Sequence, residues 1–176
     1  MTRRLIAGAA QAQDDPIKIG MAAYGLNAEF MQLWTNAAEQ HPAVTSGLVE
    51  LTVFDGRYDA LVQQDQFETM ITQGFDAIVF APMDVEAGAT AVQLAVDAGI
   101  PVFLVNAEIN QEGLAKAQLV SNNAQGAALG AQAWVEAVGD TGTFVELFGA
   151  PSDNNAQTRS NGFEVPRMKA KNPTPT

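Results

Sequence analysis

Four short apolar runs alternate with longer segments of helical pattern, and this alternation constrains the fold more than any other feature of the sequence. The runs are residues 17–22, 49–54, 76–81 and 101–105, and turn-forming residues lie between them. Strands that are buried on both faces are rich in apolar residues, and one helix between successive strands gives parallel βαβ units. The sequence therefore predicts an α/β fold, with a parallel sheet covered by helices on both faces.

The segments between the runs carry the signals that begin and end helices. Asp59 and Asp84 are expected to cap helices at their N-termini, and Gly74 and Gly99 to close them. The helix after the first run is expected to be capped by Asn27 and to carry its apolar face on four residues: Phe30, Leu33, Trp34 and Ala37. Beyond the fourth run the pattern predicts an extended segment over 118–121, a helix from Asn122 or Asn123 to Val138 and a strand over 143–148.

The composition excludes several classes of site. The formal net charge is −11, from 20 Asp and Glu against 9 Lys and Arg, and so acidic a chain repels nucleic-acid backbones and anionic membranes. With no cysteine and one histidine, the chain cannot form disulfides, thiolate nucleophiles, cysteine-ligated zinc, iron–sulfur clusters or histidine-rich metal sites. The phosphate-binding patterns G-x-G-x-x-G and G-x-x-x-x-G-K-[ST] are absent. We expect no metal, no cofactor and no nucleic-acid partner.

The two ends of the sequence differ from its body. Residues 1–13 have the order of a secretory signal: basic Arg3 and Arg4, an apolar stretch over 5–10 and a small-x-small site over 10–12. The apolar stretch is shorter than the usual length of about 7–15 residues, so we interpret 1–13 as the remnant of a shortened signal peptide. Residues 166–176 combine proline with Lys and Arg and contain no acid, which predicts a disordered basic tail.

Polar and aromatic residues follow the predicted strands. In parallel sheets, ligands bind beyond the carboxyl ends of the strands. At these ends the sequence places Tyr24, Asn27, Phe30 and Asn106. Hydrogen-bonding groups beside aromatic rings suit a small polyhydroxylated or otherwise polar ligand.

Several motifs, in order along the chain, carry a resemblance to a known family. They are Asn-Ala-Glu-Phe at 27–30, Gln-Gly-Phe-Asp-Ala-Ile-Val-Phe-Ala-Pro-Met-Asp at 73–84, Ala-Gly-Ile-Pro-Val at 98–102, Ser-Asn-Asn at 121–123 and Arg-Ser-Asn-Gly-Phe at 159–163. With these motifs the chain resembles the type I periplasmic sugar-binding proteins of the ribose and galactose class, over about residues 17–165.

The resemblance implies two α/β lobes that close on a sugar. Residues 14–120 would form the N-terminal lobe, and 121–165 only the first helix and strand of the second, so that the chain is an incomplete fragment. It implies a periplasmic protein that is not an enzyme, that needs no cofactor and that delivers a monosaccharide or similar polar solute to the membrane permease of an ABC transporter. We expect it to act as a monomer.

The resemblance also assigns roles to residues. Asn27 would donate hydrogen bonds to sugar hydroxyls, Phe30 would stack on the sugar ring, and Arg159 would reach the sugar from the second lobe. Asn106 stands where ribose binders carry Asp followed by Arg, and here Ala107 follows it, so ribose is not implied and the ligand stays unnamed. Four further residues are expected at the hinge or cleft: Tyr24, Asp84, Ser121 and Asn123.

Other interpretations of these residues stay open. Asn27 and Asp84 could be helix caps only, and Arg159 could pair with carboxylates. The same fold serves as the ligand-sensing domain of regulators of the lac-repressor class, although residues 1–15 leave no room for a helix-turn-helix. A small α/β enzyme would need two convergent carboxylates with pKa values pushed apart, drawn from Asp55, Asp84 and Glu108.

Overall fold

The computed structural model describes residues 15–139, 141 and 143–171. Its centre is a parallel five-stranded sheet in the order β2-β1-β3-β4-β5. The strands are β1 (Ile17–Ala23), β2 (Val49–Asp55), β3 (Ala77–Phe80), β4 (Val102–Val105) and β5 (Ala117–Leu119). The four predicted strands and the short extended segment after them are therefore confirmed, and so is the α/β fold class.

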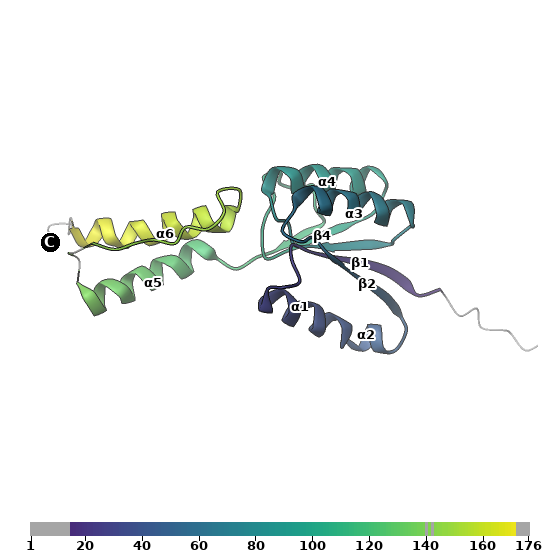
Figure 1. Cartoon of the computed structure of the whole chain (residues 1–176), viewed down its shortest axis with the longest axis horizontal. Helices are drawn as coiled ribbons and strands as arrows, with labels where there is room; N and C mark the ends of the chain where they lie inside the picture. The colour runs from purple at the N-terminus through teal and green to yellow at the C-terminus, as the bar shows by residue number, and fades with distance from the viewer. Residues whose placement is uncertain (1–14, 140, 142, 172–176) are drawn as a thin grey trace, which may run out of the picture.

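Helices cover both faces of this sheet. Helices α3 (Ala60–Thr72) and α4 (Val85–Asp97) lie on one face, and α1 (Glu29–Glu39) and the short α2 (Pro42–Thr45) lie on the other (Figure 1). Under α3 and α4 the core contains Phe67, Phe80, Ile78 and Val92, all fully buried. The rings of Phe67 and Phe80 meet edge to face with centroids 4.7 Å apart, a favourable geometry for aromatic pairs.

The apolar face predicted for α1 is wrong in part. Met31 and Thr35 are the buried residues of this helix, whereas Phe30 is 56% and Leu33 64% exposed. Met31 packs against Ala23 and Ala81. Met31 has a long, flexible thioether side chain that packs well against these two small residues, so this side of α1 faces the sheet.

The predicted N-terminal capping residues are confirmed for α3, α4 and α5 and are wrong for α1. Asp59 Oδ1 accepts from the Leu61 N–H, and Asp84 Oδ1 accepts from two N–H groups of α4, so both acids cap their helices as predicted. Asn122 caps α5 through the Gln125 N–H. Helix α1 begins after Ala28, which has no capping side chain, so Asn27 is not its cap.

The last part of the chain forms a separate pair of packed helices, α5 (Asn123–Val138) and α6 (Asn154–Lys171), which lie beyond the end of the sheet (Figure 1). The strand predicted over 143–148 is not formed, and Val145 and Leu147 are 85% and 94% exposed. Backbone groups of a strand need a neighbouring strand to pair with, and among the described residues none lies beside this segment.

The disordered tail predicted over 166–176 also needs correction. Helix α6 continues to Lys171, so residues 166–171 are helical. Met, Lys and Ala at 168–171 are good helix formers, which favours extension of the helix past Pro166. Residues 172–176 and the predicted signal remnant at 1–13 lie outside the described residues. Within the described part, no helix combines the length and the apolar character needed to cross a membrane.

Candidate functional site

A cavity of about 290 Å³ lies between the carboxyl ends of the strands and the beginning of α6. Tyr24 follows β1, Pro82 follows β3 and Asn106 follows β4, so this is the sheet edge where ligands bind in parallel folds. The opposite wall comes from residues just before and within α6. The full lining is Tyr24, Tyr58, Pro82, Met83, Asn106, Ala107, Ala150, Asp153, Asn155 and Arg159.

Two tyrosine rings form the aromatic wall of this cavity. The centroids of Tyr24 and Tyr58 are 5.4 Å apart and the ring planes are tilted by 56°. The Tyr58 N–H donates to the Tyr24 carbonyl at 2.7 Å. A Cβ atom on Gly25 would lie 2.3 Å from the Tyr58 ring, so only glycine leaves room for the ring in this position.

The loop that carries Tyr58 has an unusual backbone. Arg57 and Tyr58 are consecutive non-glycine residues in the left-handed region, with φ of 52° and 57°. Such conformations cost about 1–3 kcal/mol each and persist where the surroundings fix them. Here Asp55 fixes the loop, because its Oδ1 accepts from the N–H groups of Arg57 and Leu26, both at 3.0 Å.

Asn155 connects the two walls of the cavity. Its Nδ2 donates to the backbone carbonyl of Asn106 at 2.8 Å, and its Oδ1 accepts from Asn123 Nδ2 at 2.9 Å. Its backbone N–H donates to Asp153 Oδ1 at 2.9 Å. Asn155 is only 8% exposed, so these bonds are shielded from water. They join the end of β4 to the beginnings of α5 and α6.

Arg159 lies on the polar side of the cavity with its guanidinium oriented by two partners. Nη1 donates to Asn123 Oδ1 at 3.1 Å, and Nη2 lies 3.6 Å from Asp153 Oδ2. The side chain is 51% exposed. An exposed ion pair contributes little to stability, so its main effect is to orient the guanidinium. The remaining N–H groups of the guanidinium fork are suited to hydroxyl or carbonyl oxygens.

Both tyrosines of the chain belong to this cavity, which makes it accessible to spectroscopic titration. Burial raises the pKa of Tyr24 above its ordinary value of 10.0, and the charges that Tyr58 and Asp153 can carry add to this effect. In the Tyr58→Phe chain, tyrosinate absorbance should therefore appear with a midpoint above pH 10.0.

The same pKa shift makes a prediction for stability. As the pH rises, Tyr24 loses its proton at a lower pH in the unfolded chain than in the folded one. Its stabilising contribution to the free energy of unfolding is therefore complete below pH 10.0 and is lost as the pH rises through the folded-state pKa. Tyr24→Phe should flatten the fall in unfolding free energy at alkaline pH, measured by urea titration. A midpoint at or below that of free tyrosine would contradict the partly buried position of Tyr24.

The residues predicted as ligand contacts fall into two groups. Tyr24, Asn106 and Arg159 line the cavity together. Asn27 and Phe30 are exposed at the beginning of α1 and are not part of its lining.

The predicted hinge or cleft residues are also divided. Asn123 lies directly behind the lining, bonded to Asn155 and Arg159. Ser121 borders a neighbouring cavity together with Glu108. Asp84 caps α4 and does not line the main cavity.

Most of the lining was missed by the sequence reasoning, and Tyr58 and Asn155 matter most among the missed residues. Tyr58 comes three residues after the carboxyl end of β2, so the rule that selected Tyr24 and Asn106 could have found it. Asn155 stands in a stretch of Asp and Asn residues that could equally form an ordinary turn, and no sequence signal marks its contact with Asn106.

The carboxylates that an enzyme would need do not converge. Asp55 accepts two backbone N–H bonds, Asp84 caps a helix, and Glu108 borders the neighbouring cavity. None of the three lines the main cavity. In the part of the chain that the structure describes, no three His, Asp or Glu side chains are grouped to hold a metal ion.

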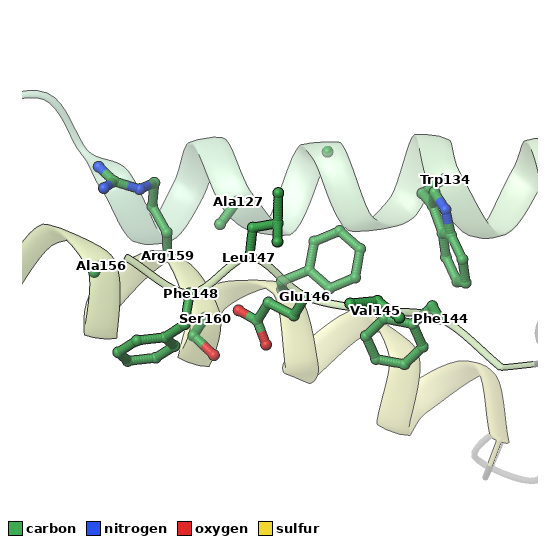
Figure 2. Close-up of a pocket in the computed structure, with 12 residues that line it drawn as sticks. Ala127, Trp134, Phe144, Val145, Glu146, Leu147, Phe148, Ala156, Arg159 and Ser160 are labelled. Atoms are coloured by element: carbon green, nitrogen blue, oxygen red, sulfur yellow. The ribbon is translucent and has the colours of Figure 1, made fainter. Parts of the chain in front are cut away.

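A second cavity, of about 400 Å³, lies between α5, α6 and the segment 144–148 (Figure 2). Trp134, Phe144 and Phe163 form an aromatic cluster there, with centroids 5.7–6.4 Å apart. Val145 and Leu147 add further apolar surface. This mainly apolar lining offers few hydrogen-bonding groups, so the cavity beside the sheet is the better candidate for a polar ligand.

Known proteins that are similar to this chain in sequence or structure bind sugars or other small solutes. The chain is 45% identical over 116 residues to a D-apiose import binding protein of Paraburkholderia graminis, covering 63% of this chain and 37% of that one. The crystal structure of a galactofuranose-binding protein matches with a TM-score of 0.81 at 27% identity, covering 89% of this chain and 53% of that one. An ABC transporter solute-binding protein from Mycobacterium smegmatis with bound glycerol matches with a TM-score of 0.77 at 27% identity, covering 86% and 51%.

The chain thus spans about a third to a half of the length of these proteins. The model of the periplasmic binding protein domain matches residues 19–170, which include nearly the whole sheet, α5 and nearly all of α6. This match and the parallel fold agree, and the chain belongs to the periplasmic binding protein domain family.

Proposed function

We propose that the protein binds a monosaccharide or similar small polyol outside the cytoplasm and delivers it to the permease of an ABC importer. The observation that carries this proposal is the composition of the cavity beside the sheet. One wall offers the rings of Tyr24 and Tyr58, and the other offers the half-exposed guanidinium of Arg159. Apolar ring faces and hydrogen-bonding groups together match the C–H faces and hydroxyl groups of a sugar.

The relatives support a binding function over catalysis. Their names describe an import binding protein for D-apiose, a galactofuranose-binding protein and a solute-binding protein of an ABC transporter. The family is described as a periplasmic binding protein domain, which supports a periplasmic location. Action as a monomer and the absence of a nucleic-acid partner are part of the same proposal, the latter in keeping with the net charge of −11.

The division into lobes belongs to the proposal as well. Residues 14–120 would form the first lobe, since the sheet ends with β5 at Leu119. Residues 121–165 would begin the second lobe, since α5 and α6 pack mainly on each other. Asn27 and Phe30, at the start of α1, stay proposed contacts for a ligand that extends beyond the cavity.

The experiment that tests this function is a nuclear magnetic resonance titration of the chain with D-apiose, D-ribose, D-galactose and myo-inositol. Binding in the cavity predicts saturable shifts in the signals of Tyr24, Asn106 and Asn155. Shifts that do not saturate, or that spread evenly over the surface, would contradict the proposal. Lactate serves as a small anionic control, and we expect it to bind more weakly than the sugars.

Asn106→Asp should change the preference among sugars more than it changes the fold. Asn106 has φ of 69°, a conformation that aspartate also tolerates, and the two side chains have nearly the same size. The change removes two N–H donors and adds a charged acceptor, so a sugar that accepts from Asn106 should lose roughly 1–3 kcal/mol of binding free energy. The ligand panel and the thermal midpoints of both chains measure this. Equal affinities together with a lower midpoint would make Asn106 a structural residue only.

A further inference from the structure

We infer that Tyr58 is the residue on which a ring-shaped ligand stacks, and that it makes the site prefer cyclic polyols over acyclic ones. This inference rests on the proposed function and goes further, because it names a selecting residue and the ligand shape that it selects. Neither the motifs of the sequence nor the names of the relatives assign a role to Tyr58.

The first step is the position of the ring. Tyr58 lines the cavity and is 43% exposed, so part of its ring is open to a ligand. Tyr24 contacts the ring from one side at 5.4 Å between centroids. Arg159 and Asn155 belong to the same lining and come from the other part of the chain. A ligand in this cavity would therefore have an aromatic surface and hydrogen-bonding groups within reach.

The second step is that the ring is held in advance. The Tyr58 N–H bonds to the Tyr24 carbonyl at 2.7 Å, and the Gly56 N–H bonds to the Ala23 carbonyl at 2.9 Å. Gly25 supplies the space in which the ring lies, since a Cβ there would overlap it. A side chain that is already fixed loses little freedom when a ligand binds, which favours affinity.

The third step is the backbone strain. A glycine at position 58 would adopt φ of 57° without steric cost, whereas tyrosine does so against its preference. Strained conformations of this kind gather at binding sites, where a side chain must point in one direction. A requirement for the Tyr58 ring in the cavity, as a surface for the ligand, would explain why the strained backbone is kept at this position.

The ligand shape follows from the chemistry of stacking. A cyclic sugar or inositol presents a rigid face of C–H bonds, and an aromatic ring packs on such an apolar face. An acyclic polyol has the same hydroxyl groups but no rigid face, and it must lose internal rotations to present one. The ring of Tyr58 therefore contributes more to binding of the cyclic ligand.

The test compares three variants of the full chain with wild type. Tyr58→Gly removes the ring and relieves the strained backbone. Arg57→Gly relieves the same kind of strain at the neighbouring position and keeps the ring, so it is the matched control. Tyr58→Phe keeps the ring and removes only the hydroxyl group. The probes are myo-inositol and D-ribose as cyclic ligands and xylitol as an acyclic one, measured by resonance titration together with thermal midpoints.

We expect Tyr58→Gly to weaken binding of the best cyclic probe by about tenfold or more while its thermal midpoint stays equal or rises. Xylitol binding should change much less, so the preference for the cyclic probe should shrink. Arg57→Gly and Tyr58→Phe should keep most of the wild-type preference. With only two tyrosines in the chain, the ring signals of Tyr58 can be assigned and should shift on saturation with the cyclic probe.

Three results would overturn the inference. If Tyr58→Gly binds the cyclic probes as well as wild type does, Tyr58 is not a stacking residue, and the proposed function survives. If its thermal midpoint falls and both kinds of probe lose affinity equally, the role of Tyr58 is structural. If wild type binds no sugar or polyol at all, the proposed function and the inference fail together.

Discussion

Replacing Phe67 with alanine is expected to lower the free energy of unfolding by about 3–5 kcal/mol, the largest effect of any single substitution considered for this protein. Phe67 is fully buried between α3 and the sheet, and its ring meets that of Phe80 at 4.7 Å. Truncation removes the transfer free energy of the ring and leaves a cavity that the surrounding strands can fill only in part. Urea unfolding followed by circular dichroism measures the change.

The matched control for this prediction is Phe30→Ala. Phe30 is also a helical phenylalanine, but it is exposed at the beginning of α1. Its removal should change the free energy of unfolding by about 0.5 kcal/mol or less. If Phe30→Ala costs as much as Phe67→Ala, the packing of α1 described above is wrong.

Gln63→Leu is expected to lower the free energy of unfolding by about 2–4 kcal/mol, although leucine is the more hydrophobic residue. Gln63 is buried on α3, where its side-chain Nε2 donates to the Ala81 carbonyl at 3.0 Å. Its Oε1 accepts from the Met83 N–H at 2.9 Å. Leucine would leave both backbone groups without these partners in a place where water has little access.

Gln64→Leu is the control for this change, because Gln64 is the next residue on the same helix and is only partly buried. Gln64→Leu should shift the urea midpoint of unfolding far less than Gln63→Leu does. Gln63→Leu should also weaken ligand binding, since Pro82 and Met83, which line the cavity, lie in the segment that Gln63 holds. A Gln63→Leu chain as stable as wild type would show that the two bonds contribute nothing.

The sequence alone determined the elements that depend on local patterns. Apolar runs separated by single helical segments require a parallel sheet, because both faces of each strand must be covered. Asp59, Asp84 and Asn122 cap helices because a short polar side chain before a helix satisfies its free N–H groups. Tyr24 and Asn106 were found for a similar reason, since both follow carboxyl ends of strands.

Only the tertiary structure decided the features that depend on contacts between distant segments. The rotation of α1 follows from the packing of Met31 against Ala23 and Ala81, which lie far from it in space until the chain has folded. The segment 143–148 has the pattern of a strand, but a strand forms only where another strand pairs with it. Tyr58 and Asn155 enter the candidate site through the backbone of Tyr24 and Asn106, segments that lie far from them in sequence. No local pattern records such contacts, because the partners come together only when the chain has folded.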